Sequence, residues 1–250
     1  MSGQQSGSTS DPGDPFGDAA ALEGLPSLYA GTRDGIDTIL RDRGLRRTTP
    51  EDTATSLLEG AAASATLEGS PVTADELANG AGDPTARGSL RLSGELLGLV
   101  PTWSRSPVQA LARMHAVATT GFSPDAGRPV NPAGVARLGT LAQVLGRPTA
   151  APGLVVAALV HAEIVTAGAF GTHNGLVARA AERLVLVVTG VDPASVTVPE
   201  VGHAAEPDGY RAALDAYGTA TAAGTQQWLQ YASQAFSRAA EASPVSPGRR

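Results

Sequence analysis

The 250-residue sequence contains no cysteine, which excludes disulfides, thiolate nucleophiles, cysteine-ligated zinc and iron–sulfur clusters. It contains no lysine either, because all 18 basic residues are arginine, and this excludes a phosphate-loop lysine, Schiff-base chemistry and pyridoxal cofactors. The sequence also lacks the signatures of α/β-hydrolases, zinc metalloproteases and dinucleotide-binding folds. Many covalent and cofactor-dependent mechanisms are therefore closed to this chain.

Positive charge is scarce as well. The 18 basic side chains face 24 acidic ones, and the resulting net charge of −6 has the wrong sign for binding nucleic acid or an anionic membrane. The most apolar stretch, residues 153–160, is followed by His161 and Glu163 and is far shorter than the ~20 apolar residues of a membrane span. We therefore expect a cytoplasmic protein that binds neither nucleic acid nor membrane.

The composition predicts one folded domain between two tails. With 42 % hydrophobic and 17 % charged residues, the chain resembles a soluble globular protein. Residues 1–21 begin with MSGQQSGSTSDPGDPFGD, which lacks the basic and apolar segments of a signal peptide and predicts a disordered acidic tail. Residues 242–250, with two prolines and terminal arginines, predict a second disordered tail. The folded domain is expected at 22–241.

Start and stop signals within this domain are mostly helical. Thr49 before Pro50 predicts a helix over 50–66, and capping boxes at Thr73 and Ser106 predict the starts of two more. Apolar periodicity and terminal residues predict further helices at 131–146, 153–167, 176–189, 210–223 and 226–240.

Two segments are less clear. The LVLVV run at 184–188 is compatible with a strand, but its length and the preceding ARAAER favour a helix. A short strand is expected only at 196–201. The predicted fold class is therefore all-α.

One stretch predicts a binding site. The loop GAFGTHNG, residues 168–175, lies directly ahead of a predicted helix, and its backbone amides can join those of the first helical turn in an anion cradle. Arg179 lies one turn into that helix and can reach the same anion. The candidate nucleotide- or anion-binding residues are Phe170, Gly171, Thr172, His173, Asn174, Gly175 and Arg179. The alternative is a tight turn followed by a surface arginine.

The same stretch resembles the signature of the Fic (Fido) family, H-P-F-x-[D/E]-G-N-G-R-x-x-R. It matches at Phe170, Asn174, Gly175 and the second arginine, Arg179. Upstream, SATLEG resembles the family's inhibitory motif [S/T]-x-x-x-E-[G/N], with matches at Ser64, Glu68 and Gly69. Segments 111–117, 157–170 and 210–232 are similar to the family's framework helices, so the resemblance covers about residues 29–240. It implies an all-α Fic-like core with an N-terminal inhibitory-type helix.

The resemblance implies transfer of a nucleotide monophosphate, usually AMP from ATP, to a protein hydroxyl. Three positions depart from the signature. Gly168 replaces the histidine that acts as general base in the family, and Thr172 replaces the acid that holds magnesium. Leu176 replaces the first arginine. Loss of a general base alone costs about 10²–10⁴ in rate, so we expect negligible AMP transfer. A neutral hydroxyl is a poor magnesium ligand, so magnesium binding is doubtful. No catalytic residue and no metal ligand is assigned.

In autoinhibited family members the inhibitory glutamate pairs with the second signature arginine, which here implies an ion pair between Glu68 and Arg179. Three hypotheses follow. The first is a Fic-fold pseudoenzyme that binds ATP or another nucleotide, a phosphate, or a protein partner. The second is an active enzyme that transfers nucleotidyl or phosphoryl groups by altered chemistry, and the third is a purely structural or regulatory module. A homodimer also stays open, because small helical domains often pair symmetrically.

The four histidines are scattered through the chain. His115 and His161 lie in apolar helices, where a hydrogen-bonded core histidine is expected. His203 lies in a polar segment and is expected to be solvated. His173 takes the place of the first loop glycine of the signature, where its side chain is expected to close part of the cradle.

Overall fold

Helices make up all the regular structure of the computed structural model within residues 13–42 and 48–247, the part that it describes. The elements are α1 Pro15–Ala20, α2 Leu25–Asp42, α3 Pro50–Leu67, α4 Ala74–Ala78, α5 Pro84–Glu95, the 3-10 helix η2 Leu96–Leu99, α6 Val100–Arg105, α7 Pro107–Thr119, α8 Pro132–Leu145, α9 Gly153–Ala167, α10 Asn174–Val188, α11 Pro199–Ala204, α12 Pro207–Gly218 and α13 Ala222–Glu241. The predicted all-α class is confirmed. Among these helices, none is long and apolar enough to cross a bilayer.

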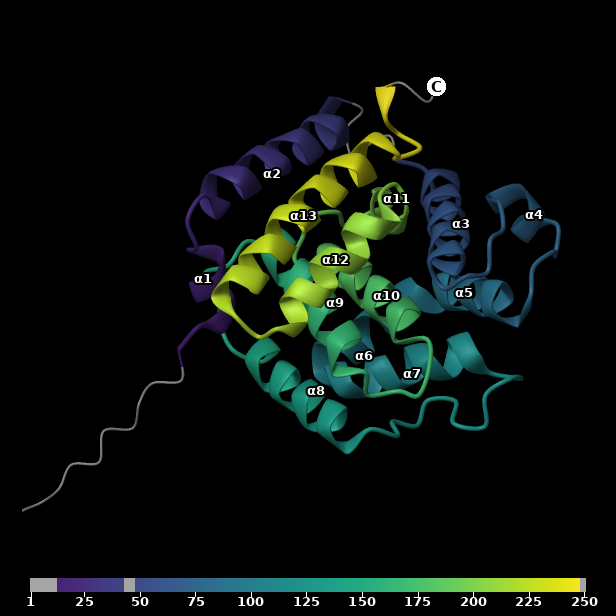
Figure 1. Ribbon diagram of the computed structural model, residues 1–250. Helices are drawn as coiled ribbons and strands as arrows, with labels where there is room; N and C mark the ends of the chain where they lie inside the picture. Colours follow the sequence, from purple (N-terminus) through teal and green to yellow (C-terminus); the bar gives the residue numbers. More distant parts are fainter. Residues whose placement is uncertain (1–12, 43–47, 248–250) are drawn as a thin grey trace, which may run out of the picture.

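The centre of the molecule is the helix pair α9 and α10, which pack along each other and are enclosed by the remaining helices (Figure 1). Eleven of the 15 residues of α9 are buried, on every side of the helix, as expected for a helix in the middle of a core. The LVLVV run forms the last part of α10, so the helix predicted there is confirmed. The connection between the two helices, residues 168–173, carries the signature-like loop.

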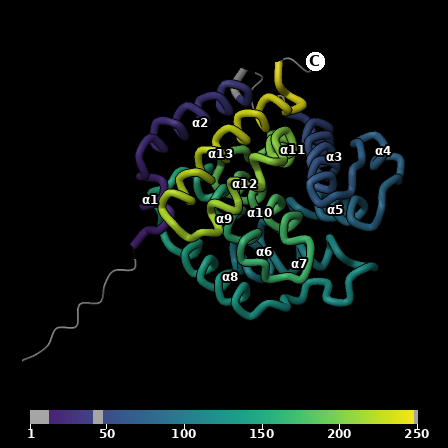
Figure 2. Tube along the Cα trace, in the orientation of Figure 1, coloured from purple at the N-terminus to yellow at the C-terminus, as the bar shows by residue number. Residues whose placement is uncertain are grey.

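Two long helices on the outside, α2 and α13, lie side by side (Figure 2). Their contact includes polar bonds as well as apolar packing, because the Tyr29 hydroxyl donates to the Leu229 carbonyl at 2.9 Å and the Thr32 and Ser233 hydroxyls are 2.8 Å apart. No signal in the sequence analysis predicted α2. These contacts hold the helix against α13.

Helices α3, α4 and α5 form a second, smaller apolar cluster beside the main core. The face of α3 that meets α5 consists of alanines such as Ala61 and Ala65, which allow close approach of the two backbones. Ser89 on α5 donates to the Ala61 carbonyl at 2.8 Å and fixes the register of the pair. This packing brings the C-terminal end of α3, with Glu68, to the first turn of α10.

The helix starts agree with most of the predicted signals. The helix start predicted at Thr49 and the capping box predicted at Thr73 are confirmed, and both side chains form complete capping boxes, at α3 and α4. Ser106 does lie at the N-cap of α7, but its side chain makes no capping bond, so the capping box predicted there is wrong. The break between the last two helices falls at residues 219–221, where Thr221 caps α13, and not at Gly224.

The strand predicted at 196–201 is wrong. Residues 196–198 form a buried loop, and Pro199 begins α11 at a position where proline is favoured in helices. The described chain offers no neighbouring strand for pairing, and the Thr197 amide donates instead to the Asp192 carboxylate at 2.7 Å. Val196 and Val198 are therefore buried in the core although they belong to no β-sheet.

The ordered body extends beyond the predicted limits of 22 and 241. Asp14 caps α1 through the Gly17 amide at 2.9 Å, and the Phe16 side chain is buried in the core. At the other end, Val245 is buried against the main core. Contacts with residues far away in the sequence attach each short segment, and a composition average does not detect them. The rest of the predicted tails, 1–12 and 248–250, lies outside the described residues.

Candidate functional site

The signature-like loop is a closed turn between α9 and α10. It begins at Gly168, whose φ of 54° ends α9 in the left-handed region, and it ends at His173, whose φ of 59° lies in the same region. Asn174 bridges the loop, because its side chain accepts from the Phe170 amide at 3.0 Å and donates to the Phe170 carbonyl at 2.7 Å. The Phe170 ring is buried and stacks on His115 at a centroid distance of 4.3 Å. The side chains of Asn174 and Phe170 therefore hold the turn in this conformation.

Backbone N–H groups are the donors that the loop leaves free. Within the described residues, the amides of residues 171–176 have no hydrogen-bond acceptor, whereas the Val177 amide already donates to the His173 carbonyl. These free groups include the first turn of α10, where helix geometry also places partial positive charge. The loop thus presents free backbone donors that can attract an anion, and anion binding there stays a prediction.

Both histidines of the loop region use their ring nitrogens for contacts within the protein. The His173 ring contacts the hydroxyls of Thr85 on α5 and Thr172, at 3.1 and 2.7 Å. His115 accepts from the Gly127 amide at 3.0 Å, and its other nitrogen lies 3.2 Å from the Thr172 carbonyl. Burial lowers the pKa of His115, which keeps that ring neutral at pH 7.

Arg179 is the most constrained residue of the predicted site. Its guanidinium is only 2 % exposed and makes four hydrogen bonds. Three of them reach α3, namely to the Ser64 hydroxyl at 2.7 Å, the Ser64 carbonyl at 3.1 Å and the Glu68 carboxylate at 2.8 Å. The fourth is to the Tyr210 hydroxyl at 3.2 Å. The alternative of a surface arginine after a tight turn is therefore wrong, since Arg179 is in the core.

The Glu68 carboxylate lies over the first turn of α10. A β-carbon at Gly175 would collide with a Glu68 carboxylate oxygen and crowd the Arg179 guanidinium, so a larger residue there would displace the Glu68 side chain. The Glu68 side chain is about one-fifth exposed, whereas the side chain of its partner Arg179 is only 2 % exposed. Its negative charge thus occupies the position at the helix N-terminus where a bound phosphate would be stabilised.

The three departures from the signature have different surroundings. A β-carbon at Gly168 would meet no atom within 4 Å, so the space for a side chain is open there. Thr172 is exposed, and its hydroxyl is engaged with His173. Leu176, in contrast, is 1 % exposed and part of the main apolar core.

Comparison with known proteins bears on the fold. No family model matches the chain, and no curated protein matches its sequence. Among solved structures, a Fic family protein from Desulfovibrio desulfuricans G20 is 19 % identical, with a TM-score of 0.69 over 84 % of this chain and 73 % of its own. Two forms of a Fic-1 fragment from C. elegans also match. One, with a glutamate-to-glycine substitution, is 16 % identical with a TM-score of 0.64 over 85 % and 70 % of the two chains. The other is 18 % identical with a TM-score of 0.59 over 91 % and 77 %.

The chain has a Fic fold. This result confirms the fold implied by the resemblance of the two motifs.

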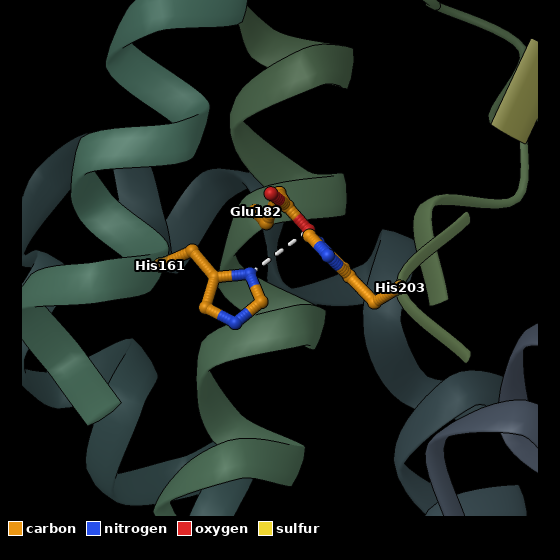
Figure 3. Close-up of side chains that lie close together, drawn as sticks. All are labelled: His161, Glu182 and His203. Atoms are coloured by element: carbon orange, nitrogen blue, oxygen red, sulfur yellow. Dashed lines mark hydrogen bonds and ion pairs between the residues drawn. The ribbon is translucent and has the colours of Figure 1, made fainter. Parts of the chain in front are cut away.

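Behind the loop, the Fic fold of this chain contains a buried charge network. Figure 3 shows His161 of α9, Glu182 of α10 and His203 of α11 converging in the core. One Glu182 oxygen lies 3.0 Å from His161 Nδ1 and 2.9 Å from His203 Nε2. His203 is fully buried, so its predicted solvated position is wrong, and its segment is a core helix rather than a polar loop.

Tyr210 connects this network to the site. The Arg179 guanidinium can only donate, so the Tyr210 oxygen accepts its hydrogen bond. The Tyr210 hydroxyl then donates its own proton to His161 Nε2, which lies 2.7 Å away. His161 Nδ1 then carries the ring proton and faces Glu182. Burial lowers the pKa of His161 to about 4, which makes the ring neutral at pH 7. The chain of contacts therefore runs from Glu68 through Arg179 into the centre of the fold.

The donor atoms of His161, Glu182 and His203 all lie within 4.8 Å of one another, a set that could hold a metal ion such as Zn²⁺. The two contacts at 3.0 and 2.9 Å are shorter than the about 3.3 Å between neighbouring ligands of tetrahedral zinc. Metal binding would require these side chains to spread. In this arrangement the cluster is a charge network. Sequence spacing could not reveal it, because the three residues come from three helices.

A second buried arginine lies one turn further along α10. Arg183 forms an ion pair with Glu200 of α11 at 2.6 Å and donates to the Ser56 hydroxyl of α3 at 2.9 Å. Sequence analysis did not single out this residue. Together with Arg179 it connects α10 to α3 at two successive turns.

Proposed function

We propose that this chain is a Fic-fold pseudoenzyme whose loop and α10 N-terminus bind a nucleotide phosphate when the Glu68 carboxylate moves away. The observation that carries this proposal is the position of Glu68, which occupies the helix N-terminus while the amides of residues 171–176 have no acceptor within the described residues. A carboxylate and a phosphate compete for the same partial positive charge. The chemical class of ligand is a nucleotide such as ATP, ADP or AMP.

The same geometry argues against transfer chemistry. Gly168 offers no proton acceptor, and the nearby His173 ring is already engaged with Thr85 and Thr172. Magnesium does not fit the loop, because Thr172 supplies a neutral hydroxyl where a carboxylate is needed. Leu176 is packed in the apolar core, so it leaves no cation in the place of the first signature arginine.

Calorimetric titration with ATP, ADP and AMP, with and without Mg²⁺, tests the proposal on the wild-type chain and on Glu68→Gly. We expect binding by the variant that is at least tenfold tighter than wild-type binding and does not depend on Mg²⁺. Glu95→Gly is the matched control, because Glu95 also ends a helix and pairs with an arginine, Arg113, away from the loop. Absence of binding by Glu68→Gly would refute nucleotide binding.

Transfer is tested separately with ATP labelled at the α-phosphate and at the γ-phosphate. We expect no label on protein targets or on the chain itself, with wild type or with Glu68→Gly. Label that appears with either variant would refute the pseudoenzyme proposal and favour the active enzyme with altered chemistry.

A second candidate function, a protein-interaction module, rests on a different observation. Two large apolar side chains beside the loop are more than one-third exposed: Phe122 and Val130. Phe122 contacts His173, and the Val130 amide donates to the Ala169 carbonyl at 2.9 Å, so both residues border the loop itself. For this function we expect no nucleotide binding by any variant and a partner complex that is lost in Phe122→Ser.

A further inference from the structure

A cavity of about 600 Å³ lies at the other end of the α9–α10 pair from the signature-like loop. It is bordered by the first turn of α9, the last turns of α10 and α8, and the C-terminal part of α6. Because α9 has 15 residues and a helix rises 1.5 Å per residue, the cavity is about 20 Å from the loop. It is therefore separate from the proposed nucleotide site.

The walls of this cavity combine an apolar interior with positive charge at the mouth. Trp103, Val156 and Val185 line it, and each of them is at most 5 % exposed. Arg105 and Arg147 also line it and are exposed to solvent. No acidic residue belongs to the lining, although acidic residues outnumber basic ones in the chain. A volume between 300 and 1,000 Å³ is typical of small-molecule sites.

Neither of the two arginines at the mouth forms an ion pair with a carboxylate within the described residues. Of the twelve arginine side chains that the structure describes, eight form an ion pair with a carboxylate: Arg33, Arg113, Arg128, Arg137, Arg179, Arg183, Arg211 and Arg238. Among the other four, Arg91 donates to three backbone carbonyls, and Arg87 and Arg105 donate to one each. The Arg147 side chain has no partner within the described residues. Two of these four cations without a carboxylate partner, Arg105 and Arg147, line the same cavity.

The carboxylate of Asp14 does not neutralise them. Asp14 contacts the lining residue Thr149, and its oxygens accept from the Thr149 hydroxyl at 2.7 Å and from the Ala150 and Gly17 amides at 2.8 and 2.9 Å. The hydrogen bonds from the Gly17 and Ala150 amides lower the pKa of Asp14. This carboxylate holds the segment beside the cavity in place, and leaves Arg105 and Arg147 available to a ligand.

We propose that this cavity binds a small amphipathic anion. A carboxylate or phosphate group would lie between Arg105 and Arg147, where two guanidinium groups can each form charge-assisted bonds. The apolar body of the ligand would pack against Trp103, Val156 and Val185, where burial of apolar surface is favourable. The shared chemistry is an anionic head on an apolar body, from a fatty acid or from an aromatic phosphate.

Titration calorimetry with decanoate and with 1-naphthyl phosphate tests this proposal and separates the two sources. Decanol lacks the charge and inorganic phosphate lacks the apolar body, so we expect both to bind at least tenfold more weakly than the matching probe. Quenching of Trp103 emission in a Trp228→Phe background reports binding in the cavity itself. The probe with the larger affinity identifies the source.

Variants complete the test. Arg105→Gln and Arg147→Gln should each weaken binding of the better probe by at least tenfold, whereas the matched exposed variant Arg128→Gln should leave it unchanged. Glu68→Gly should also leave it unchanged, which distinguishes this site from the proposed nucleotide site. The proposal is overturned if neither probe binds, if decanol binds as well as decanoate, or if both glutamine variants bind like the wild type.

Discussion

Replacing Arg179 with methionine is expected to lower the free energy of unfolding by about 3–5 kcal/mol, the usual effect of removing one partner of a buried ion pair. The structure places this guanidinium at 2 % exposure with four hydrogen bonds, three of them to Ser64 and Glu68 at the end of α3. Methionine is similar in length and keeps the apolar packing, so the loss reports the polar bonds. For a chain of this size the change corresponds to roughly 6–20 °C in Tm.

Urea denaturation followed by circular dichroism measures this loss, with Arg211→Met as the control. Arg211 pairs with Asp208 on the surface, where side-chain exposures are 63 % and 94 %, so its replacement should have almost no effect. Combining Arg179→Met with Glu68→Gln gives a double-mutant cycle, and we expect a favourable coupling energy of more than about 1 kcal/mol. If Arg179→Met destabilises the chain no more than Arg211→Met does, the role of Arg179 as an anchor between α3 and α10 is refuted.

Two further predictions concern packing and pH. Gly88→Ala should destabilise the chain by about 1–3 kcal/mol, because its β-carbon would collide with the Ala118 carbonyl oxygen where α5 meets α7. In the same helix, the β-carbon of Gly94→Ala would meet no atom within 4 Å, so this variant should stabilise the chain by up to about 1 kcal/mol. Urea denaturation measures the free energy of unfolding of both variants, and equal effects would contradict the predicted collision at Gly88. Burial lowers the pKa of His161 to about 4 from 6.5, so the unfolded chain binds a proton that the folded chain does not. The free energy of unfolding should therefore be highest above pH 6.5 and should fall as the pH decreases to 4, by at most about 1.4 kcal/mol per pH unit. A Tm that is constant over this range would contradict this prediction.

Local signals in the sequence predicted the helices that they begin. Thr49 and Thr73 each sit three residues before an acid that caps them in return, and this arrangement depends only on neighbouring residues. The strand predicted at 196–201 failed for the opposite reason. Val196 and Val198 are buried in a loop, and burial alone does not distinguish a core loop from a strand.

The candidate site shows the same division. The turn at 168–175 was predictable, because its glycines, Asn174 and the following helix are consecutive in the sequence. The Glu68–Arg179 ion pair was implied by the resemblance of two motifs, and the structure contains it at 2.8 Å. The network behind it could not be predicted, because it joins His161, Glu182 and His203 from three helices.

The burial of the signature positions explains why a resemblance in this loop is a better guide to fold than to activity. The side chains of Phe170, Asn174 and Arg179 match the signature, and each one makes internal contacts that hold the loop or join α10 to its neighbours. Two of the departures, Gly168 and Thr172, make few packing contacts, since a β-carbon at Gly168 would meet no atom within 4 Å and Thr172 is exposed. We expect replacement of the first group to destabilise the fold and replacement of Thr172 to leave it intact, whereas the positive φ of Gly168 strains any other residue at that position. A chain can therefore keep the motif's framework without its reaction, and ligand binding by Glu68→Gly is a more direct measure of function than the number of matching positions.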